Sequence, residues 1–239
     1  MTLLVASDWH LSPRSPAAHA RLARDFLALA RAERARVVLN GDVFDDLFSG
    51  PGRAEAAHPE VVRDIEALAA EGRLVRTRGN HDPGAGEERA VLDVPGTGRV
   101  LVLHGHQVDP LSRSPAGRLG DAVSRRFGRT LAVRWAARLA EEGARAVAGG
   151  PMASLFRRRA LALVVREGFD LGVFGHVHVA HAAPGDRYAN AGALLGEALQ
   201  FLELGPAGPV PRILRLRAGA EGRQRGALPA EVGRGERAP

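Results

Sequence analysis

The chain has 239 residues with a net charge of +6; 45% of the residues are apolar, 25% are charged, and none is cysteine. This length allows one sizeable core, and the lack of cysteine excludes disulfides and thiolate metal ligands and fits a reducing cytoplasm. No stretch approaches the roughly 18 apolar residues of a membrane-spanning helix, and residues 1–10 lack the features of a signal peptide, so we expect a cytoplasmic protein.

In chain order, short apolar runs typical of strands alternate with amphipathic runs typical of helices. Helices are predicted over 21–33 and over 59–71, the second with Pro59 at its start and Gly72 after its end. This alternation predicts an α/β layered fold. Strands are predicted at 3–7, 37–39, 74–77, 100–103, 171–174, 188–192, 199–204 and 212–217.

Residues 111–168 interrupt this rhythm and contain 12 of the 33 basic residues but only 4 of the 27 acidic ones. The segment therefore has a net charge of +8, whereas the rest of the chain has −2. Apolar residues recur every fourth position from Leu119 to Leu139, and 155–165 is predicted to be another helix. We interpret the segment as a helical insertion or cap whose stripe packs against the body, with an acyl-chain groove as the alternative. Residues 218–239 lack apolar periodicity and are expected to be disordered.

Polar side chains follow five of the predicted strands. Because ligands of open α/β sheets lie outside the carboxyl ends of strands, these groups are expected to meet at one site. Residues i and i+2 of an extended backbone point the same way, so each Asp-x-His or His-x-His pair should face one ion or two neighbouring ions. Flanking glycines allow tight turns beside the site. The polar groups are Asp8 with His10, Asp42, Asn80 with His81 and Asp82, His104, and His176 with His178; the glycines are Gly41, Gly79, Gly105 and Gly175.

Carboxylate, imidazole and amide ligands together suit Mn²⁺, Fe or Zn²⁺. The candidates exceed what one ion accepts, and Asp42 is the natural bridge between two ions. Two ions about 3.5–4 Å apart clamp a phosphate and lower the pKa of a bridging water, and the resulting hydroxide attacks phosphorus without a protein nucleophile. His104 is preferred over His106 as a ligand because it comes first after the strand, and Asp45 and Asp46 are either rim residues or turn formers.

The five polar blocks have the order Asp-x-His, Gly-Asp, Gly-Asn-His-Asp, a lone His and Gly-His-x-His, and they span about residues 5–192. In this pattern the chain resembles the calcineurin-like metallophosphoesterases. Within that family it is most similar to the UDP-2,3-diacylglucosamine pyrophosphatases, although these have Arg in place of His81 and Asp in place of His106. The segments that carry the closer resemblance are 7–11, 41–45, 104–109 and 188–192.

The resemblance implies a four-layer α/β/β/α metallophosphoesterase sandwich over residues 1–217, with the helical insertion at about 111–168. It also implies two divalent metal ions, with Mn²⁺ expected first and Fe or Zn²⁺ as other fits. His81 would protonate or stabilise the leaving oxygen, and Asp82 would orient His81. The implied ligands are Asp8, His10, Asp42 and His178 for one ion, and Asp42, Asn80, His104 and His176 for the other.

The leading function is a metal-dependent phosphoesterase with a bridging hydroxide, hydrolysing a UDP-diacylglucosamine-like pyrophosphate at the inner membrane face. Arg157, Arg158 and Arg159 are the expected substrate-binding residues, because a guanidinium binds phosphate oxygens bidentately. One alternative is a soluble phosphodiesterase or phosphatase that acts on nucleotides or phosphoproteins. Another is a catalytically silent binding scaffold, against which the complete ligand set argues. A nucleic-acid partner is not expected, since one Tyr and two Trp provide no stacking platform.

Overall fold

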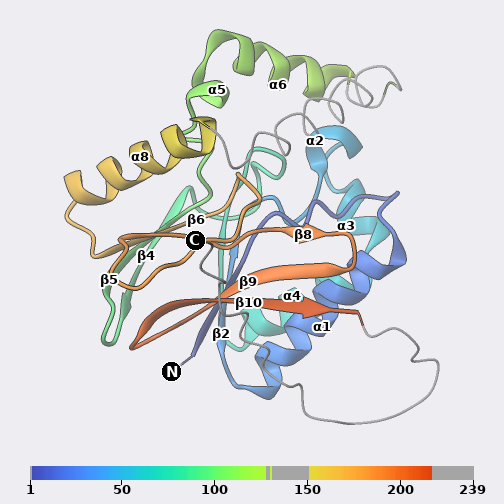
Figure 1. Ribbon diagram of the computed structural model, residues 1–239. Helices are drawn as coiled ribbons and strands as arrows, with labels where there is room; N and C mark the ends of the chain where they lie inside the picture. The colour runs from blue at the N-terminus through green and yellow to red at the C-terminus, as the bar shows by residue number, and fades with distance from the viewer. Residues whose placement is uncertain (1, 128–129, 131–150, 217–239) are drawn as a thin grey trace, which may run out of the picture.

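A computed structural model describes residues 2–127, 130 and 151–216 of the chain (Figure 1). The far half of the predicted apolar stripe, and the tail predicted at 218–239, therefore lie outside the described residues.

The first sheet has six strands in the order β10-β9-β1-β2-β3, with β8 paired to β9. Strands β1, β2 and β3 are parallel, whereas β9 runs antiparallel to both β1 and β10. The three parallel strands thus end at the same edge of the sheet. The strand bounds are β1 Leu3–Ala6, β2 Arg36–Asn40, β3 Leu74–Thr77, β8 Leu194–Leu195, β9 Ala198–Gly205 and β10 Gly208–Arg215.

The second sheet has four strands in the order β4-β5-β6-β7. Strands β5, β6 and β7 are parallel, and β4 pairs antiparallel with β5 at the edge. Strand β4 was not predicted, because its outward positions include the charged Arg89 and Asp93 and the sequence lacks a continuous apolar run there. The bounds are β4 Arg89–Val94, β5 Gly98–Leu103, β6 Leu171–Phe174 and β7 Tyr188–Asn190.

Helices cover the outer face of each sheet (Figure 1). Helices α1 and α4 pack on the first sheet, and α8 packs on the second. Three short helices, α2, α3 and α5, and the longer α6 lie in the connections between strands. The bounds are α1 Ala17–Ala32, α2 Asp46–Ser49, α3 Arg53–Ala57, α4 Pro59–Ala70, α5 Pro110–Arg113, α6 Pro115–Phe127 and α8 Pro151–Arg166.

The alternation of side chains along the strands produces the layers. In β1, Leu4 joins the core under α1 and α4, whereas Val5 joins the core between the two sheets. In β5, Val102 faces that same inner core, and Leu101 faces α8. Full burial of each such aliphatic side chain contributes about 1.5–3 kcal/mol. The predicted four-layer α/β/β/α arrangement is therefore confirmed.

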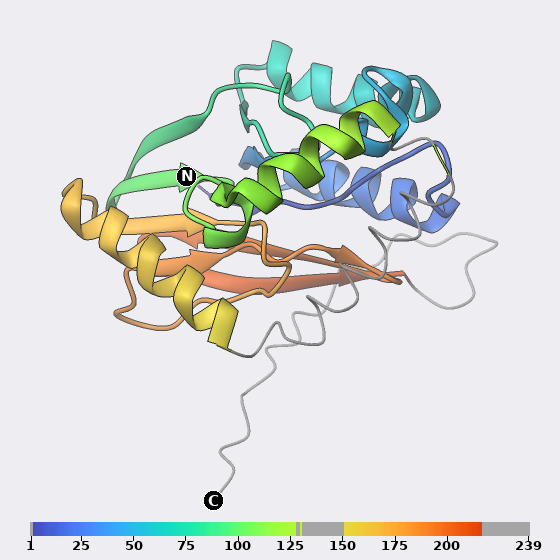
Figure 2. The ribbon, with the colours of Figure 1, turned by 90° about the horizontal axis from the view of Figure 1, so that it is seen from above.

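Part of the predicted insertion lies across one end of the molecule. Figure 2 looks down on this end and shows α6 crossing it, and α6 comes close to α2. Helix α8 confirms the helix predicted at 155–165. The prediction that the apolar stripe packs against the body is wrong where it is described, because Leu119 is 65% exposed and Val123 is 38% exposed. Among the described helices, none combines the length and apolarity needed to cross a bilayer.

Candidate metal centre

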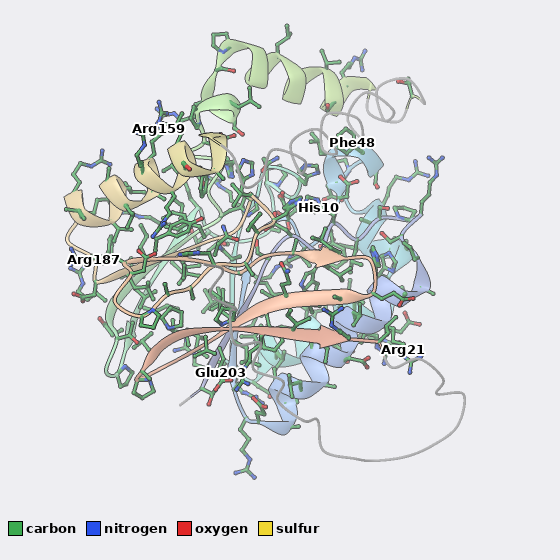
Figure 3. The ribbon with its side chains drawn as sticks, viewed as in Figure 1. His10, Arg21, Phe48, Arg159, Arg187 and Glu203 are labelled. Atoms are coloured by element: carbon green, nitrogen blue, oxygen red, sulfur yellow. The ribbon has the colours of Figure 1, made fainter. Side chains whose placement is uncertain are left out.

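The candidate ligands follow the carboxyl ends of β1, β2 and β3 in one sheet and of β5 and β6 in the other. Figure 3 shows His10 at this end of the molecule, on the same side as α6. Phe48 on α2 lies near the site, with its ring centroid 5.5 Å from that of His81. The convergence of strand ends expected from the sequence is therefore observed across both sheets.

The four residues predicted for the first ion lie together. The Nε2 atom of His178 is 3.1 Å from Oδ1 of Asp8 and 3.1 Å from Nε2 of His10. The same His10 nitrogen is 3.7 Å from Oδ1 of Asp8 and 3.8 Å from Oδ2 of Asp42. These separations place carboxylate oxygens and imidazole nitrogens around a common point, as ligands of one cation are placed.

His104 extends this cluster toward the second predicted ion. Its Nε2 atom is 3.2 Å from Oδ2 of Asp42 and 3.9 Å from Oδ1 of Asp8. Its Nδ1 atom lies 2.8 Å from the backbone oxygen of Asn40. A carbonyl oxygen only accepts, so Nδ1 carries a proton, and the neutral form of the ring has its lone pair on Nε2, where a metal requires it.

Three buried ligand atoms test whether these residues fit a metal. Oδ1 of Asp8, Oδ1 of Asn80 and Nε2 of His104 make no hydrogen bond within the described part of the chain, although the first and third lie within ion-pair distance of His178 and Asp42. Buried polar atoms without a partner are costly and uncommon. A divalent cation would satisfy all three, and their carboxylate, amide and imidazole chemistry matches such an ion.

His176, the fourth ligand predicted for the second ion, belongs to none of the close groups of ligand atoms found among the described residues. Its Nε2 atom is 3.2 Å from Oδ2 of Asp109 and 3.3 Å from Oγ of Ser112. Its backbone N–H donates to Oδ2 of Asp8 over 2.9 Å. The sequence interpretation missed Asp109, although it lies in the segment 104–109 that carries the resemblance.

His81 lies beside the cluster, with its ring centroid 4.5 Å from that of His10. Asp45 contacts its Nδ1 at 3.0 Å. The expectation that Asp82 orients His81 is therefore corrected. Asp82 instead accepts three backbone N–H groups, from Asp42, Val43 and Gly79, so it holds together the two loops that carry Asp42 and Asn80.

The backbone at the site departs from the extended geometry expected for the paired ligands. Asp8, His10, Asp42, His176 and His178 all have positive φ, between 47° and 69°. Non-glycine residues in this region cost about 1–3 kcal/mol each and persist only where the surroundings hold them. Here Asp8 N–H donates to the Gly41 oxygen over 3.1 Å, and His10 N–H donates to the Asp42 oxygen over 2.9 Å. The paired ligands thus converge through strained loops beyond the strand ends.

Glycine is required at positions 79 and 175 because a side chain would not fit there, and not because the backbone has positive φ. A Cβ atom on Gly79 would lie 1.9 Å from Oδ1 of Asp42, and one on Gly175 would lie 2.5 Å from Oδ2 of Asp8. Contacts this short cannot occur. The glycines in these two turns of the predicted motif therefore leave room for the carboxylates of Asp42 and Asp8.

Close packing of acids and imidazoles shifts their pKa values strongly. Burial alone would lower the pKa of His104, but the carboxylates of Asp42 and Asp8 outweigh it and raise this pKa to about 10. The same balance raises the pKa of His10 to about 9. Burial would raise the pKa of Asp42, yet the charges of His104 and His81 hold it well below its usual range. Burial lowers the pKa of His106 to about 3, with His104 contributing.

The three arginines predicted to bind substrate differ. Arg157 forms an ion pair with Asp186 and lies over the ring of Tyr188, 5.8 Å from its centroid. Arg158 and Arg159 are exposed. Arg159, labelled on α8 in Figure 3, lines a cavity of about 640 Å³ between α8, β5 and the loop after His104. The expectation is therefore not supported for Arg157, whose guanidinium contacts a carboxylate of its own chain.

The family model for the calcineurin-like phosphoesterases matches residues 1–180. The chain belongs to this family. That membership makes it a hydrolase that acts on phosphate esters, and the family implies divalent metal ions.

Among curated proteins, no sequence matches the chain. Solved structures with a similar fold include a predicted phosphoesterase from Streptococcus pneumoniae (14% identity, covering 90% of this chain and 88% of that one, TM-score 0.46). Others are a dimetal phosphatase from Danio rerio (13%, 88% and 98%, 0.44) and Vps29 of Entamoeba histolytica complexed with Zn²⁺ (16%, 90% and 99%, 0.44). These likenesses concern the fold alone.

Proposed function

We propose that the protein is a two-metal phosphoesterase. The observation that carries the proposal is the set of three buried ligand atoms, on Asp8, Asn80 and His104, that have no hydrogen bond within the described residues. One ion would be held by Asp8, His10, Asp42 and His178, and the other by Asp42, Asn80, His104 and His176. Bound ions would polarise the phosphate and supply a hydroxide at neutral pH. Mn²⁺ is the first choice, with Fe and Zn²⁺ as alternatives for this mixed donor set.

His81 is the residue of this chain that we assign to the leaving group. Asp45 accepts the Nδ1 proton of His81 at 3.0 Å, which fixes the ring and leaves Nε2 to act on the substrate. The backbone N–H of His81 donates to Oδ1 of Asp42 over 2.8 Å, so the ring and the bridging carboxylate are held in one unit. Asp82 has a structural part in this scheme, through its three backbone hydrogen bonds.

The substrate proposed is an amphiphilic one, a nucleotide–lipid pyrophosphate of the UDP-diacylglucosamine kind. The cavity beside the His104 loop supports it, because Leu101, Leu103 and Leu163 provide apolar walls and Arg113 and Arg159 provide cationic ones. The two glutamates of the lining, Glu88 and Glu167, form ion pairs with Arg78 and Arg89. An acyl chain and an anionic group need this combination.

The insertion at residues 111–168 has features that favour a peripheral contact of the protein with the inner membrane face. Leu111 is 60% exposed and Leu119 is 65% exposed, within a segment whose net charge is +8. Exposed apolar side chains among many arginines favour an anionic membrane surface. Binding to vesicles with and without anionic lipid, at low and high salt, tests this part of the proposal, and equal binding to both vesicle types would contradict it.

A hydrolysis panel tests the reaction class. Purified protein, with its metal content measured, is given a phosphomonoester, a phosphodiester, a nucleotide pyrophosphate and UDP-diacylglucosamine. We expect metal-dependent hydrolysis that a chelator abolishes and added Mn²⁺ restores. Protein with two bound ions that hydrolyses none of these compounds would favour a binding scaffold.

Two neighbouring arginines test the substrate. Arg159→Ala should raise KM for UDP-diacylglucosamine and leave a small soluble phosphodiester unaffected. Arg158→Ala is the matched control, because it removes the same charge from the next position of α8 without lining the cavity. Equal effects of the two substitutions would contradict the cavity assignment. A preference of the wild-type protein for soluble nucleotides over UDP-diacylglucosamine would favour a soluble phosphodiesterase that acts on nucleotides.

A further inference from the structure

The ring of His176 is held by the first residues of the insertion. Oδ2 of Asp109 lies 3.2 Å from Nε2 of His176, and Oγ of Ser112 lies 3.3 Å from the same nitrogen. An ionised carboxylate only accepts hydrogen bonds, so Nε2 must carry the proton. The lone pair is then on Nδ1, which makes no hydrogen bond within the described residues.

Asp109 is itself fixed by several hydrogen bonds. As the N-cap of α5, it accepts the backbone N–H of Leu111 over 3.1 Å and that of Ser112 over 3.0 Å. The hydroxyl of Ser112 also donates to it over 2.6 Å. A carboxylate held this firmly can impose one orientation on the imidazole that it contacts.

The two histidines predicted for the second ion use opposite ring nitrogens. His104 donates its Nδ1 proton to the Asn40 oxygen and keeps Nε2 for a ligand. His176 donates its Nε2 proton and keeps Nδ1. In both cases a partner outside the ligand set determines the tautomer, which is how the partners of metal-binding histidines generally act.

We propose that Asp109, assisted by Ser112, is a positioning residue that sets the tautomer and orientation of His176 and thereby the affinity of the second metal position. The start of the insertion is then part of the metal centre as well as of the cap. The inference rests on the proposed role of His176 as a metal ligand.

Asp109→Asn is the decisive variant, because Asn caps a helix about as well as Asp but lacks the carboxylate. Two measurements follow its effect. In metal-free, ¹⁵N-labelled protein, the nitrogen shifts of His176 should report the Nε2–H tautomer in the wild type and a mixture in the variant. In metal titrations, the first ion should bind as in the wild type, and the second should bind about 10–100-fold more weakly.

Two further variants keep the result interpretable. Ser112→Ala leaves the capping carboxylate in place and should weaken the second ion by a smaller factor. Asp186→Asn is the matched control, since Oδ2 of Asp186 lies 3.0 Å from Nε2 of His181, a histidine outside the ligand set. It should leave both ions unchanged.

His176→Ala separates this inference from the proposed function. If His176→Ala loses the second ion while Asp109→Asn binds both ions and keeps the wild-type tautomer, the positioning role is overturned and the ligand assignment stands. If His176→Ala keeps both ions with unchanged affinity, the ligand assignment fails, and the inference fails with it.

Discussion

The two proposed ion positions are built in different ways. At the first, ligand atoms of Asp8, His10 and His178 lie within 4.8 Å of one another, on loops that continue β1 and β6. At the second, His104 joins the shared Asp42, but His176 is held by Asp109, just before α5. The first position follows from the meeting of two sheets, whereas the second also depends on a contact with the insertion.

This difference indicates which changes should affect one ion and which should affect both. Asp42 belongs to both positions, so Asp42→Ala should have the largest effect. We expect loss of hydrolysis and of at least one metal ion per chain, measured by elemental analysis and by turnover of a phosphodiester. Asp8→Ala should weaken mainly the first position. An Asp42→Ala protein that retains two ions and full activity would falsify the shared-ligand assignment.

His81 separates chemistry from metal binding. His81→Ala should retain both ions and reduce the hydrolysis rate by about 10²–10⁴-fold, which is the usual range for loss of a general acid. The loss should shrink for substrates with good leaving groups, because these need little protonation. His181→Ala serves as control, since this histidine pairs with Asp186 and lies outside the ligand set. A uniform loss across leaving groups, or loss of an ion, would count against the acid role.

Most of the fold was predictable from the sequence because the local pattern and the tertiary structure agree. Strands β1, β2, β3, β5 and β6 are apolar runs that end in polar ligands, and α1 and α4 have one apolar face. The prediction missed β4, β8 and the short helices α2, α3 and α5, which lack such a pattern. Elements this short are stabilised by their neighbours rather than by their own propensity.

The candidate ligands were predictable by residue type, whereas their partners were not. Asp45 is 36 residues from His81, and Asp109 is 67 residues from His176. Only the folded chain brings such pairs together. The positive φ of Asp8 and His10 could not be predicted for the same reason, since it is held by hydrogen bonds to the loop after β2 and does not follow from the residue type.

Gly79 tests whether space around the bridging carboxylate matters. Gly79→Ala would place a Cβ 1.9 Å from Oδ1 of Asp42. The loop must shift, at a cost of about 1–3 kcal/mol for overpacking. We expect a lower Tm and weaker binding of both ions, since Asp42 serves both. Gly84→Ala is the matched control, because its Cβ would meet nothing within 4 Å. Similar metal affinity in the two variants would argue against the close approach.

The pH dependence of metal binding is the smallest of the expected effects. It compares the number of protons that each of the two ion positions releases when an ion binds. Carboxylates raise the pKa of His10 to about 9 and that of His104 to about 10, against burial. At pH 7, therefore, each of the two positions has a histidine with an extra proton in metal-free protein. A metal needs the neutral ring, so binding must release protons.

Metal affinity should rise by up to about tenfold per pH unit for each proton displaced, from pH 6 until the pH exceeds these pKa values.

The folding stability of the metal-free protein should change with pH in the opposite direction. The stabilising contribution of His10 and His104 is fully present below the unfolded histidine pKa of about 6.5 and is lost as pH rises through about 9–10.

Calorimetric titration of the metal in two buffers of different ionisation enthalpy measures the protons released per ion. The second ion should release the extra proton of His104. Binding without proton release at pH 7 would show that His10 and His104 are already neutral in the metal-free protein. The nearby carboxylates would then not raise the pKa values of these histidines above 7.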